Sequence, residues 1–103
     1  MAKFIYRVVS RENWEQALST GGVPRCGNDE RDGYVHLSSF ETVRETAGLY
    51  FTPDEEPLVL EIDGEALGKA LRWESVESRG GALFPHLYAD GIPVMAIVAR
   101  IEL

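Results

Sequence analysis

The chain has 103 residues, of which 45% are hydrophobic and 26% charged, a composition that excludes a disordered segment and predicts one small domain over residues 1–103. Seventeen acidic residues against ten basic ones give a formal net charge of -7, which argues against nucleic acid or an anionic membrane as the main partner. A single cysteine, Cys26, excludes an internal disulfide, and because no signal peptide or apolar run of about 18 residues is present, we expect a cytoplasmic protein.

The first twenty residues predict a strand followed by a helix. Residues 4–9 place apolar side chains on both faces, as expected of a strand covered on both sides. Ser10 is suited to cap a helix over residues 11–20, which Gly21 and Gly22 end. The apolar residues of this helix recur at helical spacing and should face the core: Trp14, Ala17 and Leu18.

The next segment predicts a polar loop and then a short strand. Residues 23–32 are mostly polar and are interpreted as a solvated loop. Residues 34–37 have the alternation of a strand, with Val35 and Leu37 facing the core. The opposite face of this strand then carries Tyr34, His36 and Ser38.

The middle of the chain predicts a second helix and a third strand. Ser38 and Glu41 have the spacing of a capping box, and the helix that follows repeats apolar residues at Phe40, Val43, Ala47 and Tyr50. Residues 52–57 form a turn, and residues 58–62 alternate as a strand. Asp63 is placed to cap a short helix.

The last third of the chain is less regular. Residues 71–74 are a weak strand candidate, and glycines and prolines interrupt residues 75–92, which we interpret as a loop. Residues 94–103 begin apolar on both faces and then admit Arg100 and Glu102, as expected of a central strand that emerges at an edge. The order of elements predicts an α+β or α/β domain, of which we expect α+β, with one mixed sheet and two to three helices.

Two histidine motifs are the strongest candidates for chemistry. His36 and Ser38 are two residues apart and project together from one strand, and His86 and Tyr88 do the same if their segment is extended. Imidazole and hydroxyl groups both donate and accept hydrogen bonds, so such pairs suit a sugar hydroxyl or a carboxamide. The alternative is that both histidines only stabilise the fold.

Other chemistries have weaker support. The two histidines lack the tight spacing of a metal site, so we expect no metal. Cys26 lies in a polar segment without a recognisable nucleophile signature, and we interpret it as an ordinary thiol. The glycine pairs form neither a dinucleotide-binding nor a P-loop motif.

Three segments together resemble a known bacterial family. They are the opening residues 5–7 followed by Trp14, the motif Asp32-Gly33-Tyr34-Val35-His36-Leu37-Ser38, and the motif Phe84-Pro85-His86-Leu87-Tyr88. The chain is similar in these segments, and over nearly its whole length, to the family called domain of unknown function 952. The resemblance implies a relation to the ADP-ribosyltransferase superfamily, with a split, strongly curved sheet that holds NAD in the active members.

The resemblance also implies roles for individual residues. His36 and Ser38 match a superfamily element that contacts the ribose and the nicotinamide amide of NAD. His86 is the residue that matches the second superfamily position, a histidine in the RNA 2'-phosphotransferases. The glutamate that many transferases use has no counterpart in a matching motif, which argues against transfer to protein acceptors.

We therefore expect a nucleotide-like small-molecule ligand, with NAD as the candidate cofactor. His36 would bind a ribose hydroxyl and Ser38 the amide or ribose, while His86 would bind a second hydroxyl or a phosphate. Tyr88 would stack on a flat ring, and Arg7 or Arg31 would face the diphosphate. Loss of nicotinamide through an oxocarbenium-like state requires mainly positioning and electrostatics. A binding module without turnover and a structural or interaction domain remain alternatives, and the oligomeric state is left open.

Overall fold

Within residues 3–103, which the computed structural model describes, the strands form three small antiparallel sheets. The first sheet has the order β1-β4-β8, with β1 (Phe4–Val9), β4 (Leu58–Asp63) and β8 (Ile97–Glu102). The second pairs β2 (Gly22–Pro24) with β7 (Gly91–Pro93), and the third has the order β3-β6-β5, with β3 (Val35–His36), β5 (Leu71–Val76) and β6 (Ala82–Leu87). The prediction of one mixed sheet is wrong, because all the strand pairs in this part of the chain are antiparallel.

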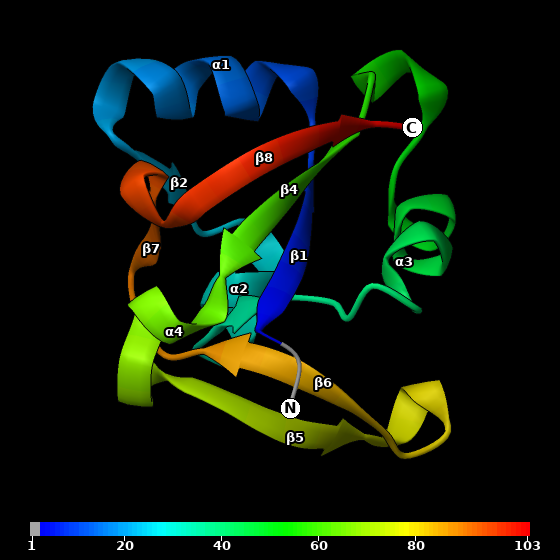
Figure 1. Ribbon diagram of the computed structural model, residues 1–103. Helices are drawn as coiled ribbons and strands as arrows, with labels where there is room; N and C mark the ends of the chain where they lie inside the picture. The colour runs from blue at the N-terminus through cyan, green and yellow to red at the C-terminus, as the bar shows by residue number, and fades with distance from the viewer. Residues whose placement is uncertain (1–2) are drawn as a thin grey trace.

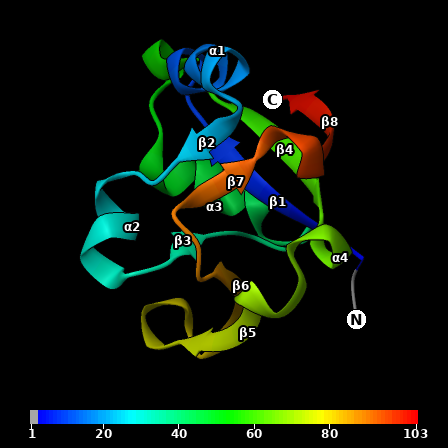
Figure 2. The same ribbon diagram turned by 90° about the vertical axis from the view of Figure 1, so that its left-hand side faces the viewer.

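Helices cover the sheets from several sides. The described residues contain α1 (Arg11–Thr20), α2 (Gly27–Asp32), α3 (Val43–Tyr50) and α4 (Gly64–Leu67), with 3-10 turns at Pro53–Glu55, Gly68–Ala70, Glu77–Arg79 and Val94–Ala96. In Figure 1, α1 crosses above the first sheet, α3 lies to its right, and the β5–β6 hairpin lies below. Figure 2 shows β2 and β7 between α1 and that hairpin. The result is a small α+β domain with more helices than the two to three expected.

Strand β1 contributes to two hydrophobic clusters, one on each of its faces. Ile5 and Val9 belong to the larger cluster, together with Leu58, Leu60, Ile62, Trp14 and Ile92 among others. Tyr6 and Val8 belong to the smaller one, with Val43, Ala47 and Val59. The prediction that both faces of this strand are covered is confirmed. Period two also turns Arg7 toward the larger cluster, so its guanidinium is buried and requires a partner.

Several predicted elements are confirmed together with their caps. The helix over residues 11–20 begins where expected, since the Ser10 hydroxyl accepts a hydrogen bond of 3.1 Å from the Asn13 N–H. Gly21 ends it with a φ of 90°, a left-handed conformation that glycine adopts without strain. The Asp63 side chain accepts from the Glu65 N–H at 3.0 Å and caps α4.

Two predicted loops contain regular structure. Residues 23–32 hold β2 and α2, and α2 was not visible in the pattern because its only buried side chain is the charged Asp29. Residues 75–92 hold β6 and β7, and β6 continues through Pro85. Both segments fold through contacts with distant parts of the chain, which periodicity does not report.

The pattern predicted only some of the buried side chains of the helices correctly. Trp14 and Ala17 are buried as expected, but Leu18 is 57% exposed. The helix predicted after Ser38 is α3. It begins at Val43, later than the capping box of Ser38 and Glu41 suggested, because Ser39 and Thr42 pair instead through their hydroxyls at 2.9 Å. Its apolar residues divide accordingly: Val43 and Ala47 are buried, and Phe40 and Tyr50 are exposed. The strand predicted at residues 94–103 begins only at Ile97, as β8, and lies at an edge of the first sheet.

Residues 35–38 pass from the third sheet to the first. The segment begins as β3 beside β6, whereas Ser38 exchanges two backbone hydrogen bonds of 2.8 and 2.7 Å with Tyr6 of β1. Pro85 of β6 accepts the Leu37 N–H at 3.1 Å but has no N–H to return. The proline therefore ends β3 after two residues, and the chain continues toward β1.

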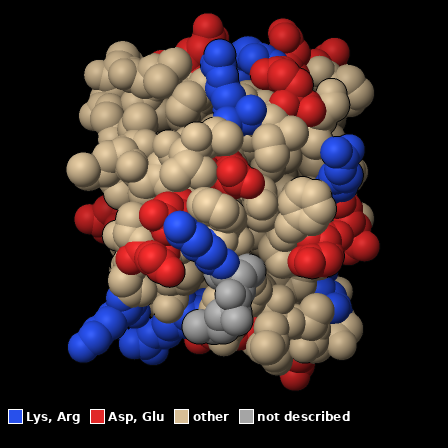
Figure 3. Space-filling view, viewed as in Figure 1, with Lys and Arg blue, Asp and Glu red and all other residues tan. Residues whose placement is uncertain are grey.

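Two features of the structure bear on the predicted partners. No helix within residues 3–103 has the length and apolar character needed to cross a bilayer. On the face shown in Figure 3, acidic and basic side chains are interspersed. This face therefore presents no continuous basic surface of the kind that binds polyanions.

Candidate functional site

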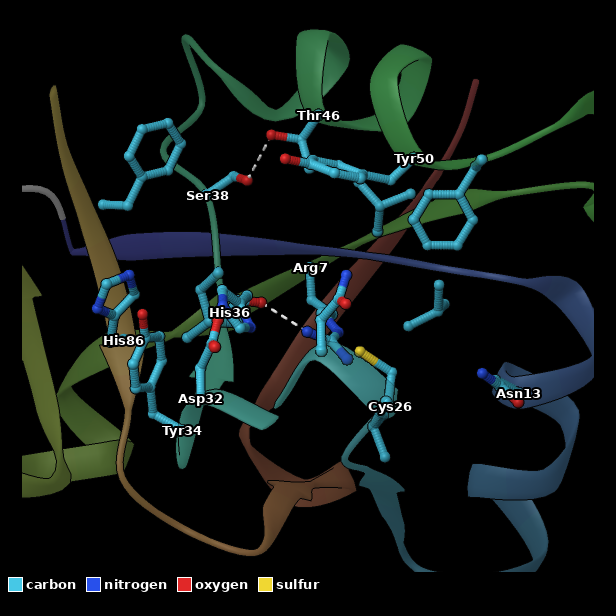
Figure 4. A pocket seen from close by; sticks show the side chains of 18 of the residues that line it. Arg7, Asn13, Cys26, Asp32, Tyr34, His36, Ser38, Thr46, Tyr50 and His86 are labelled. Carbon is cyan, nitrogen blue, oxygen red and sulfur yellow. Dashed lines mark hydrogen bonds and ion pairs between the residues drawn. The ribbon is translucent and has the colours of Figure 1, made fainter. Parts of the chain in front are cut away.

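A cleft of about 690 Å³ is bordered by β1, β2, the start of α1, α2, residues 34–38, α3, the turn after β5, and β6 (Figure 4). Five of the predicted site residues line this cleft: Arg7, Arg31, His36, Ser38 and His86. The ring centroids of the two histidines are 5.9 Å apart. The structure therefore brings together residues that are 50 positions apart in the sequence.

His36 is held between two carboxylates. Its Nδ1 lies 2.7 Å from Oδ1 of Asp29, and its Nε2 lies 2.8 Å from Oδ2 of Asp32. A carboxylate only accepts hydrogen bonds, so both contacts are satisfied together when both ring nitrogens carry a proton. The imidazole edge that should bind a ligand is thus already engaged, although the side chain is 35% exposed.

Asp29 is the centre of the polar network beneath the cleft. Its side chain is fully buried and accepts hydrogen bonds from the Arg7 guanidinium, from the backbone N–H of Cys26 and from both the backbone N–H and the ring of His36. Burial alone would raise the pKa of this carboxyl, but the hydrogen bonds from His36 and Arg7 outweigh it and hold the pKa well below its ordinary value. Asp29 is therefore a charged group that joins β1, α2 and β3.

The two candidate arginines differ in their freedom to bind an anion. The buried Arg7 contacts both carboxylate oxygens of Asp29, at 3.3 and 2.8 Å, and donates to the backbone carbonyl of His36 at 2.6 Å. Its two terminal nitrogens are thus engaged inside the protein. Arg31 is exposed and pairs with Asp32 through bonds of 2.8 and 3.1 Å. Only Arg31 can turn toward a ligand without breaking a buried ion pair.

His86 is held differently from His36. The residue is only 3% exposed, and the ring of Tyr34 stacks on it at a centroid distance of 4.0 Å. Its Nδ1 lies 2.8 Å from Oε1 of Glu74, and the Tyr88 hydroxyl donates to the same oxygen at 2.6 Å. Its Nε2 makes no hydrogen bond to any residue in the described range 3–103. One nitrogen of His86 is therefore fixed and the other is free.

Ser38 and Tyr88 take different places. Ser38 is buried in the wall of the cleft, and its hydroxyl donates to the Thr46 hydroxyl at 3.2 Å, which leaves its oxygen able to accept. Tyr88 is 41% exposed and does not line the cleft. Two other tyrosines line it, Tyr34 and Tyr50, and Tyr34 contacts both histidines and Tyr88. Figure 4 shows Tyr34 beside His86.

Sequence reasoning missed four residues of this arrangement: Tyr34, Asp29, Asp32 and Glu74. Tyr34 was assigned to the same face as His36, which was a usable signal for its place in the site. Asp29 lay in a predicted loop, and Glu74 lay on a weak strand candidate with no pattern linking it to His86. Within residues 3–103 no cluster of three or more histidine, cysteine or acidic side chains is arranged to hold a metal ion.

Asp32 leads to a prediction about pH. Hydrogen bonds from Arg31 and His36 outweigh desolvation and lower the pKa of the Asp32 carboxyl from 3.8 to about 2. Because the folded-state pKa is the lower one, the contact stabilises the fold above pH 3.8 and is lost as the pH falls toward 2. We expect Asp32→Asn to have a lower melting temperature than the wild type near neutral pH, and this gap to close between about pH 4 and about pH 2.

The control for this measurement is Asp54→Asn. Asp54 is exposed and its side chain makes no hydrogen bond or ion pair with a described residue, so the gap to the wild type should stay near zero at every pH. A gap for Asp32→Asn that persists unchanged at about pH 2 would show that the carboxylate contacts do not stabilise the fold.

Comparison with solved structures gives close matches over nearly the whole chain. The crystal structure of protein CC0527 from Caulobacter crescentus has a TM-score of 0.86 and 36% identity, and the match covers 97% of this chain and 85% of that one. The solution structure of the same protein has a TM-score of 0.81 and 35% identity, covering 99% of this chain and 85% of that one. A search of curated proteins found no match. A family model described as "Protein of unknown function (DUF952)" matches residues 8–100.

Proposed function

The chain belongs to the DUF952 family, and from that premise we propose that it binds a nucleotide-like small molecule, NAD or ADP-ribose, in the cleft lined by His36 and His86. The observation that carries the proposal is the convergence of the two imidazole rings, with centroids 5.9 Å apart, in one cleft. The volume of about 690 Å³ lies within the range of small-molecule sites, roughly 300–1,000 Å³.

The free hydrogen-bonding groups of the cleft suit a hydroxylated ligand. Nε2 of His86 has no partner among the described residues, and the Ser38 hydroxyl can still accept a hydrogen bond. A ribose diol offers both donors and acceptors, so it can satisfy the two groups together. The aromatic ring of Tyr34 adds an apolar surface beside them.

Asp32 has a defined part in the proposed binding. It occupies Nε2 of His36 and the guanidinium of Arg31 at the same time. A ligand that displaces this exposed carboxylate would free both side chains. His36 could then hydrogen-bond a ribose hydroxyl, and Arg31 could pair with a diphosphate. Arg7 supports this binding indirectly. It holds Asp29 in place, and Asp29 in turn fixes the orientation of the His36 ring.

Whether binding leads to turnover is a separate part of the proposal. Release of nicotinamide from NAD would proceed through an oxocarbenium-like state, which the site would have to stabilise by charge and position. Binding without turnover is the second candidate. It is favoured because Glu55 is the only glutamate among the described residues that line the cleft. Assaying nicotinamide release from NAD separates the two.

The binding proposal is tested by thermal unfolding with NAD, ADP-ribose and AMP. A ligand at about 100 times its Kd adds about 2.7 kcal/mol to the unfolding free energy, which raises the melting temperature of a domain this small by about 10 °C. We expect this shift for NAD or ADP-ribose, its loss in His36→Asn, and a larger shift at the same ligand concentration in Asp32→Ala.

The matched control is Asp54→Ala, which removes an exposed aspartate that does not line the cleft and should shift as the wild type does. His36→Asn retains an amide that can hydrogen-bond Asp29, so the variant is designed to stay folded. No shift of the wild type with any of the three ligands would overturn the proposal and favour a structural or interaction domain.

A further inference from the structure

The two histidines are alike in the sequence but not in their hydrogen bonds. His36 has a carboxylate oxygen within 2.8 Å of each ring nitrogen. His86 has one such contact, between Nδ1 and Glu74, and its Nε2 has no partner within residues 3–103. The two rings therefore present different groups to the same cleft.

The hydrogen-bond partners of His86 indicate which of its two ring nitrogens carries the proton. Glu74 accepts at a single oxygen from both His86 and the Tyr88 hydroxyl, and these two bonds, Tyr88 first, lower the pKa of Glu74. An ionised carboxylate has no proton to donate, so the proton between the two side chains belongs to Nδ1. In the neutral ring, Nε2 then carries a lone pair.

The orientation of this lone pair is fixed by packing. His86 lies on the central strand of the third sheet, is 3% exposed and is stacked against Tyr34 at an interplanar angle of 24°. The titratable and charged groups that face it come from three directions: Glu74 and Arg72 on β5, His36 on β3, and Tyr34 and Tyr88 on the flanking segments. Glu74 is the one that bonds to it directly.

We infer that His86 is the proton-accepting group of the cleft, with Glu74 as its positioning residue and Tyr88 as the support of Glu74. In the step it would perform, the O–H bond of a ligand hydroxyl or a bound water breaks, its electron pair stays on oxygen, and the proton bonds to Nε2. Glu74 then faces the resulting imidazolium and balances its charge. The identity of the ligand rests on the proposed function, whereas the state of the ring does not.

His36 does not meet the requirement for a base while both of its ring nitrogens face carboxylates. A base must offer a lone pair within hydrogen-bond reach of the proton that it removes. Both nitrogens of His36 are engaged by Asp29 and Asp32, so neither is open to a proton from a ligand unless Asp32 moves away.

The tautomer of His86 is measured by nitrogen NMR of the labelled protein at about pH 8, above the ordinary pKa of histidine. The chain has only two histidines, so His36→Asn assigns the signals of His86. We expect the proton on Nδ1 in the wild type, a shift toward the Nε2–H form in Glu74→Ala, and recovery of the Nδ1–H form in Glu74→Gln, whose amide oxygen still accepts. Tyr88→Phe is the control that leaves Glu74 in place and should retain the wild-type tautomer.

An Nε2–H tautomer in the wild type, or an Nδ1–H form that persists unchanged in Glu74→Ala, would overturn the inference. The tautomer is measured without NAD or ADP-ribose, so failure of the binding proposal would be seen separately.

Discussion

Replacing Asp29 with alanine is expected to lower the unfolding free energy by about 3–5 kcal/mol, the largest single loss we predict. The substitution leaves the buried Arg7 guanidinium without its counter-ion, and the N–H groups of Cys26 and His36 without an acceptor. A domain of this size has a total stability of about 5–15 kcal/mol, so the variant should be close to unfolding at room temperature.

Urea denaturation followed by circular dichroism measures this loss. The control is Asp32→Ala, which removes the other carboxylate on His36 from an exposed position and should therefore cost much less stability than Asp29→Ala. Adding Arg7→Met to Asp29→Ala should restore part of the stability, because the unpaired buried charge is then removed. A loss below about 1 kcal/mol for Asp29→Ala alone would contradict the role of Asp29 as the centre of the network.

Leu60→Ala is expected to destabilise the domain by about 2–5 kcal/mol. Leu60 is fully buried in the middle of β4, the central strand of the first sheet, and packs in the larger hydrophobic cluster. The side chain therefore loses its burial on substitution and leaves a cavity that the surrounding strands fill only in part. The same urea experiment measures the change.

The matched control for this prediction is Leu18→Ala in α1. The chemical change is identical, but Leu18 is 57% exposed and alanine has the higher helix propensity, so the change should stay within about 0.5 kcal/mol. Equal losses in the two variants would contradict the burial that the structure gives to them.

The strands and helices that periodicity predicted well are those whose own pattern matches their surroundings. Residues 4–9, 11–20 and 58–62 carry their apolar residues at regular spacing, and the caps Ser10 and Asp63 are local signals. Element boundaries there needed little information from the rest of the chain.

The missed elements depend on tertiary contacts. The short α2 exposes most of its side chains and is held mainly by Asp29, whose partners Arg7 and His36 come from other strands. Strand β6 contains Pro85, a residue that usually argues against a central strand. Its missing N–H is tolerated here because β3 ends at that point, which no local pattern could have indicated.

The candidate site was predicted in its pairing but not in its electrostatics. The sequence placed His36 and Ser38 on one strand, and the resemblance placed His86 with them, and all three line the cleft. The carboxylates that distinguish the two histidines come from other elements, Asp29 and Asp32 from α2 and Glu74 from β5. Their contacts depend on the three-dimensional arrangement and therefore were not accessible from spacing.

The passage of residues 35–38 from one sheet to the other has a mechanical consequence. Because His36 is paired with β6 and Ser38 with β1, a rotation of either sheet relative to the other must be absorbed by the peptide units between them. A change in the width of the cleft would therefore also change the distance between the His36 and Ser38 side chains. A ligand that contacts both residues would hold the two sheets at a defined angle to each other.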